Sequence, residues 1–162
     1  WGFNSSLTGG EGASAKESFL NVQKKAMEEY NTSVSVHINM TDAREDSFYW
    51  PVYVANDMIC RNNLGDFSSS GKLSFGNTIS LTNYCVCLVN EWNKGYTADR
   101  INRVVDACNL KYAKTVHIDA FIPRKSDYHG YTVSDAEKVM RKIIRYFRNL
   151  GIDVTTEFWQ GF

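Results

Sequence analysis

The sequence predicts an α/β fold, a partial (β/α)8 TIM barrel of which this chain would supply roughly half. Three segments alternate apolar and polar residues like β-strands, and amphipathic helices precede or separate them. Strands that alternate with helices favour parallel βαβ units. Each strand has one polar face, as expected for the inner wall of a barrel whose outer face packs on helices. A full barrel needs about 250 residues, and the chain has 162.

The composition indicates one globular domain. The chain is 43% hydrophobic, 22% charged and carries a net charge of +0, which is enough apolar content for a core and argues against disorder. The balanced charge provides no electrostatic footprint for nucleic acid, and no run approaches the roughly 18 apolar residues of a membrane span. We therefore expect neither a nucleic-acid partner nor a membrane span, and the oligomeric state stays open.

The chain begins at Trp1 rather than Met and ends at Phe162, directly after a strand-like run. We interpret residues 1–162 as a fragment of a single barrel domain in a longer protein. The four cysteines lack the CxxC spacing of a zinc site, and Cys85 and Cys87 are interpreted as small packed side chains. The redox compartment stays open.

The first unit is a helix followed by a strand. The helix is expected over residues 14–30, because Ser14 and Glu17 have capping-box spacing. The strand is expected over residues 33–40. Apolar residues on its one face are Val34, Val36, Ile38 and Met40, and polar residues on the other are Ser35, His37 and Asn39.

Residues 41–96 are expected to form a long loop insertion over one end of the fold, since Asn, Ser, Gly and aromatic residues dominate there. A further strand is possible at 82–89. A helix begins near Thr97, and its buried stripe is Ile101, Val104, Val105 and Cys108.

The last unit contains the clearest helix, expected over residues 134–150. Ser134 and Glu137 have capping-box spacing at its start, and Gly151 follows its end. The strand TVHIDAFIP at 115–123 precedes this helix, and an alternating strand at 152–158 follows it. This order repeats the design of the first unit.

Polar residues fall at the late, inward positions of all three strands: His37 and Asn39, His117 and Asp119, and Thr155 and Glu157. Asp119 could instead pair with Arg124 or Lys125, and Glu157 could be a solvated acid. Two acids at the ends of consecutive barrel strands are costly to bury without a task. Paired carboxylates suit glycoside hydrolysis, in which one attacks the anomeric carbon and the other protonates the leaving oxygen. The histidines could position them, and Trp159 could stack on a sugar ring.

Three segments carry a family resemblance: VHINMTD at 36–42, VHIDA at 116–120 and LGIDVTTEF at 150–158. Together they resemble the catalytic barrel of endo-α-N-acetylgalactosaminidases, glycoside hydrolase family 101, and its relatives. The resemblance implies that Asp119 is the nucleophile and Glu157 the acid/base. It also assigns His37, Asn39 and Asp42 to the substrate pocket.

The function implied is a retaining glycosidase that cleaves α-linked N-acetylgalactosamine from mucin-type O-glycans or glycopeptides through a covalent glycosyl-enzyme intermediate. No cofactor is expected. Such an enzyme would be secreted or lie at the cell surface, because its substrates are outside the cell.

Three alternatives stay open. The first is a metal-dependent barrel hydrolase that uses the histidines and acids as ligands, although no HxH or HExxH spacing supports it. The second is a non-catalytic carbohydrate-binding fragment, since an isolated half-barrel would expose unpaired sheet edges and could be inactive. The third is structural, a doubly wound open sheet, although neither GxGxxG nor GxxxxGK[ST] occurs.

Overall fold

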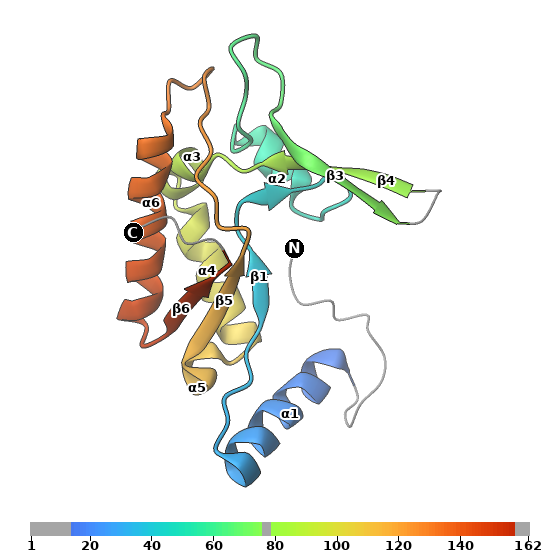
Figure 1. Ribbon diagram of the computed structural model, residues 1–162, viewed down its shortest axis with the longest axis vertical. Coiled ribbons are helices and arrows are strands. Elements are labelled where there is room, and N and C mark those ends of the chain that lie inside the picture. The colour runs from blue at the N-terminus through green and yellow to red at the C-terminus, as the bar shows by residue number, and fades with distance from the viewer. Residues whose placement is uncertain (1–13, 76–78, 158–162) are drawn as a thin grey trace.

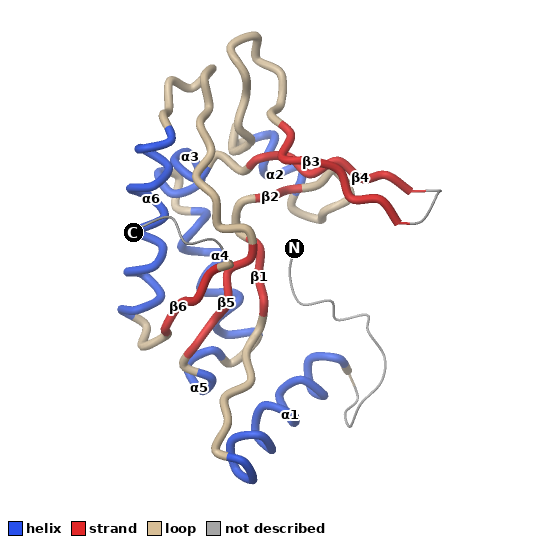
Figure 2. Tube along the Cα trace, viewed as in Figure 1, coloured by secondary structure: helices blue, strands red, loops and turns tan. Residues whose placement is uncertain are grey.

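The computed structural model describes residues 14–75 and 79–157 and has a mixed α/β architecture with two small sheets (Figure 1). The first sheet is parallel and contains β1 (His37–Asn39), β5 (Thr115–Asp119) and β6 (Asp153–Thr156), in the order β1-β5-β6. The second is antiparallel and contains β2 (Asp42–Ala43), β3 (Ser69–Phe75) and β4 (Ile79–Cys85), in the order β2-β4-β3. Figure 2 shows the two sheets as separate red groups.

The expected α/β class is confirmed, and so is the parallel arrangement of the three predicted strands. Across the described residues the parallel sheet stays open, and no closed barrel is seen. The partial barrel therefore remains a prediction. The strands are also shorter than expected: β1 begins at His37 rather than at residue 33, and β6 ends at Thr156.

The register of the parallel sheet aligns the polar positions. His37 pairs with His117, and His117 pairs with Thr155. Along β5 burial alternates as expected, because Val116 and Ile118 are fully buried while His117 is half-buried. The sheet therefore has one apolar face and one polar face.

Helices cover the apolar face. The long helices α4 (Tyr96–Ala107) and α6 (Val133–Asn149) lie on one side of β1, β5 and β6 in Figure 1. The short helices lie at the two ends of this layer, where α3 (Leu88–Asn93) packs on α4 and α6, and α5 (Leu110–Ala113) packs at the start of β5. The core between these layers includes Ile101, Val105, Met140, Ile143 and Phe147. Burial of these side chains contributes roughly 1.5–3 kcal/mol each.

The N-cap of the long helix α6 lies two residues before the predicted one, so the expected cap Ser134 with Glu137 is wrong. The N-cap is Thr132, whose hydroxyl accepts from Asp135 N at 3.2 Å, while an Asp135 carboxylate oxygen accepts from Thr132 N at 3.1 Å. The hydroxyl also donates to that carboxylate at 2.7 Å. Thr132 has the extended backbone that a capping residue requires. Gly151 ends the helix with φ 77°, as predicted.

The first helix, α1 (Ala15–Tyr30), agrees with its prediction. Ser14 is its N-cap and accepts from Glu17 N at 3.2 Å, and Asn31 ends it in the left-handed region. The helix lies apart from the other helices in Figure 1. Gln23 attaches it, since its buried amide donates to Val34 O at 3.1 Å and to Cys108 O at 3.2 Å.

Residues 41–96 contain more regular structure than a loop insertion. Besides the antiparallel sheet, this region includes α2 (Trp50–Ala55) and α3. The possible strand at 82–89 corresponds to β4, which ends at Cys85, and α3 follows within three residues. Trp50, Phe67 and Tyr84 form an aromatic group against this sheet, with ring centroids 5.0–5.9 Å apart.

All four cysteines are buried free thiols. Among the described residues, no helix is both long and apolar enough to cross a membrane, in agreement with the expectation.

Candidate functional site

The carboxyl ends of the three parallel strands bring most of the predicted site residues together. His37 and Asn39 lie on β1, His117 and Asp119 on β5, and Glu157 directly follows β6. Because the strands are parallel and in register, these ends meet at one edge of the sheet. The predicted shared face is therefore present.

His37 lies between the two acids. Its Nε2 is 3.6 Å from Asp119 Oδ1 and 3.8 Å from Glu157 Oε1. These two carboxylate oxygens are consequently at most about 7.4 Å apart, the sum of the two distances, which includes the retaining separation of about 5–5.5 Å and part of the inverting range. One imidazole nitrogen thus lies within 4 Å of both predicted catalytic carboxylates.

His117 lies beside His37 on the next strand. The two rings meet edge to face with their centroids 4.9 Å apart. The Nδ1 of His117 lies 2.8 Å from the hydroxyl oxygen of Thr155, its register neighbour on β6. This bond orients the ring, so its other nitrogen is available to a ligand.

Asn39 and Asp42 lie on the other side of Asp119. The buried amide of Asn39 donates to Asp42 Oδ2 at 2.9 Å and to Asp119 Oδ2 at 3.4 Å. Its carbonyl oxygen accepts from the backbone N–H groups of Thr41 at 2.9 Å and Asp42 at 2.8 Å. Asn39 therefore connects β1, the following turn and the carboxylate on β5.

The chain turns sharply after Asp119. Ala120 has φ 43°, which is uncommon for a residue with a Cβ, and its carbonyl accepts from the Thr41 hydroxyl at 2.8 Å. This conformation ends the strand and directs the following chain away from the sheet. Lys125, proposed as an alternative partner of Asp119, pairs with Asp127 at 2.9 Å instead.

The site is open to solvent. The side chains of His37, Asp119 and Glu157 are 55%, 34% and 43% exposed. A polar ligand can therefore reach both carboxylates directly. Trp159, the expected sugar platform, lies outside the described residues.

Two supporting contacts were not predicted. Thr155 was expected on the inward face of its strand, but its contact with His117 was not, because that contact depends on the register between β5 and β6. Ser70 donates to Asp42 Oδ1 at 2.6 Å. The antiparallel pairing of β3 with β4 and of β4 with β2 brings Ser70 to Asp42. Such distant pairing leaves no signal in the local sequence.

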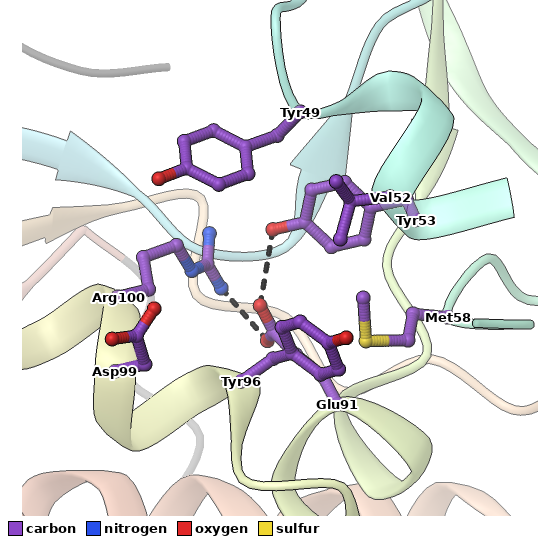
Figure 3. A pocket seen from close by; sticks show the side chains of 8 residues that line it. All are labelled: Tyr49, Val52, Tyr53, Met58, Glu91, Tyr96, Asp99 and Arg100. Carbon is purple, nitrogen blue, oxygen red and sulfur yellow. Dashed lines mark hydrogen bonds and ion pairs between the residues drawn. The ribbon is translucent and has the colours of Figure 1, made fainter. Parts of the chain in front are cut away.

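A small cavity lies beside the core near α3 and α4 (Figure 3). Its volume of about 20 Å³ holds roughly one water molecule. Glu91, with a side chain 1% exposed, accepts from Arg100 at 2.8 Å, from the Tyr53 hydroxyl at 3.0 Å and from the Thr97 hydroxyl at 3.1 Å. Burial raises the pKa of Tyr53, opposed by Arg100 and assisted by Glu91.

This ion pair has a structural role. Arg100 also donates to Met40 O at 3.1 Å, directly after β1. The charged groups are thus satisfied by one another and by the strand end, as buried charges require. The pair supports the segment between His37 and Asp42.

The third histidine belongs to a separate group near the second sheet. His129 Nε2 lies 2.7 Å from Asp57 Oδ2, and its Nδ1 lies 2.7 Å from Ser126 Oγ. Burial would raise the pKa of Asp57, but hydrogen bonds from His129 and Arg61 hold it below its usual value. Ser126 is buried and its hydroxyl oxygen accepts from Arg61 N at 2.9 Å, so it is not a nucleophile facing solvent. The group fastens the loop after β5 to the segment after α2.

Comparisons of the chain with models of protein families, with curated proteins and with solved structures each found no match.

Proposed function

We propose that this chain carries the catalytic carboxylate pair of a retaining glycoside hydrolase. The observation that carries the proposal is the position of Asp119 and Glu157 at the ends of neighbouring parallel strands, both within 4 Å of His37 Nε2. The polar face and the helix-covered face of the sheet fit the wall of a partial (β/α)8 barrel. The open edges of β1 and β6 would then pair with the remaining strands of that barrel.

In this mechanism Asp119 attacks the anomeric carbon and forms the glycosyl-enzyme intermediate. Glu157 protonates the leaving oxygen and then removes a proton from the water that hydrolyses the intermediate. The amide of Asn39 fixes the direction of the Asp119 carboxylate. His37, between the acids, would hydrogen-bond either a carboxylate or a sugar hydroxyl.

The substrate class rests on the sequence resemblance. It is α-linked N-acetylgalactosamine of mucin-type O-glycans, which implies a secreted or cell-surface protein. His117 and Asp42 would complete the polar lining of the sugar pocket.

The experiment measures hydrolysis of Ser/Thr-linked α-N-acetylgalactosaminides, with and without a further galactose, by the natively produced protein. Asp119→Asn should lower kcat by at least about 10³-fold with every substrate, a loss typical of a removed nucleophile. Glu157→Gln should lose about 10²–10⁴-fold with natural glycans. It should lose much less with aryl glycosides, whose leaving groups need no proton.

Asp153→Asn is the matched control, because Asp153 is an exposed acid at the opposite end of β6. It should retain wild-type activity. Normal turnover by either the Asp119 or the Glu157 variant would refute the assignment.

A further inference from the structure

His37, His117 and Glu157 have the arrangement of a metal-binding site. Each offers one ligand atom, and the three atoms lie within 4.8 Å of one another. His37 and His117 lie on neighbouring strands as direct register partners, and Glu157 directly follows the third strand, β6. The backbone of the sheet therefore holds the three side chains close together before any ion binds.

The spacing suits a single ion after small side-chain rotations. Metal–ligand distances of about 2.0–2.2 Å place tetrahedral ligands roughly 3.3–3.6 Å apart, and His37 Nε2 is already 3.8 Å from Glu157 Oε1. Because all three side chains are half-buried or exposed, these rotations displace no core residue.

A second feature favours metal binding. The Thr155 hydroxyl lies 2.8 Å from Nδ1 of His117, and metal-binding histidines are oriented by such a partner at the nitrogen that does not bind the ion. Asp119 Oδ1, 3.6 Å from His37 Nε2, could accept a hydrogen bond from a water bound to the ion.

We propose that His37, His117 and Glu157 bind one divalent transition-metal ion of the zinc type, and that this ion competes with the glycan for Glu157. Two imidazoles and one carboxylate select such ions over Mg²⁺ and Ca²⁺, which prefer oxygen ligands. A Glu157 oxygen that binds the ion cannot carry the proton that the leaving oxygen requires. The competition, but not the metal site itself, rests on the proposed glycosidase function.

Calorimetry of the natively produced, metal-free protein with Zn²⁺ tests the site. We expect one ion per chain and no saturable binding of Mg²⁺. His37→Ala and His117→Ala should each weaken Zn²⁺ binding by at least about tenfold, since even the loss of an outer-shell partner costs 10–100-fold.

The chain offers a matched control, because its only other histidine is His129. His129→Gln alters the group with Asp57 and Ser126 and should leave zinc affinity unchanged. Circular dichroism of each variant verifies folding. Absence of saturable zinc binding, or equal weakening by His129→Gln, would overturn the metal site.

Activity tests the competition. With an α-N-acetylgalactosaminide as substrate, Zn²⁺ should raise the apparent KM, and a chelator should restore the original rate. A rate increase with Zn²⁺ would overturn the competition and favour a metal-dependent hydrolase. If the protein binds zinc as described but hydrolyses no glycoside, the proposed function and the competition fail while the metal site stands.

Discussion

Asn39 provides a sharp test of how the site is held together, through the substitution Asn39→Asp. The change keeps the oxygen that accepts from the backbone of Thr41 and Asp42. It replaces the donating amide nitrogen by an oxygen, which lies 2.9 Å from Asp42 Oδ2 and 3.4 Å from Asp119 Oδ2. Asp42, Asp119 and the new side chain then form a group of three carboxylates instead of two. The structure therefore predicts a loss of stability from charge repulsion with little change in shape.

The magnitude follows from these distances. At an effective dielectric constant of about 20, two unit charges repel by about 6 kcal/mol at the 2.9 Å distance of Asp42 and by about 5 kcal/mol at the 3.4 Å distance of Asp119. Asp119 is 34% exposed, so solvent screens part of this repulsion. We expect Asn39→Asp to lower the free energy of unfolding at pH 7 by about 1–3 kcal/mol.

The loss should depend on pH. Repulsion raises the pKa of the new carboxyl in the folded state above its unfolded value. Such a group costs stability only where it would be ionised in the unfolded chain, so the deficit should shrink as pH falls towards about 4. Urea denaturation at pH 7 and pH 4, followed by circular dichroism, measures both values.

Asn62→Asp is a closely matched control. Asn62 Oδ1 also accepts from two backbone N–H groups, those of Leu64 and Asp66, and its amide donates to Asp66 Oδ2 at 3.1 Å. These bonds are exposed to solvent, so Asn62→Asp should cost at most about 1 kcal/mol. Equal stability of Asn39→Asp and wild type at pH 7, or a deficit that stays constant down to pH 4, would refute the reasoning.

Two further predictions concern the helices. Glu91→Ala should lower the free energy of unfolding by about 3 kcal/mol. This is the lower end for a broken buried ion pair, because the Arg100 side chain is 21% exposed. The double variant Glu91→Ala with Arg100→Met should recover part of this loss, and a double variant less stable than Glu91→Ala alone would contradict the prediction. Hydrogen bonds from the hydroxyl of Thr132, from its backbone N–H and from Lys138 lower the pKa of Asp135 to about 2. The contribution of Asp135 to stability is therefore full above pH 4 and is lost as pH falls through about 2. Asp135→Asn should therefore lower the urea midpoint clearly at pH 7 and by much less at pH 2. An equal loss at both pH values would exclude the capping role.

Periodicity predicted the parallel sheet because burial on one face leaves a two-residue signature. Val116 and Ile118 are buried and His117 and Asp119 are not, so the face of each candidate side chain followed from the sequence. The same reasoning aligned Glu157 with Asp119. The site was thus predictable to the extent that it depends on strand alternation.

Local sequence patterns did not predict the structure where two capping motifs overlap, or where strands far apart in the sequence pair with each other. The start of α6 contains two overlapping capping motifs, Thr132 with Asp135 and Ser134 with Glu137, and spacing does not distinguish them. The shorter aspartate reaches both the backbone and the hydroxyl of Thr132. In residues 41–96, pairing of β2 with β4 depends on contacts between residues 42 and 85, which no short window reveals.

The most direct measurement of the central claim is the site of glycosylation during turnover. Glu157→Ala of the natively produced protein should accumulate a covalent glycosyl adduct from an aryl α-N-acetylgalactosaminide, because an activated leaving group needs no acid while hydrolysis of the intermediate lacks its base. Peptide mass spectrometry should locate the adduct on Asp119. An adduct on another residue, or hydrolysis of the glycoside at the wild-type rate without any adduct, would contradict the account.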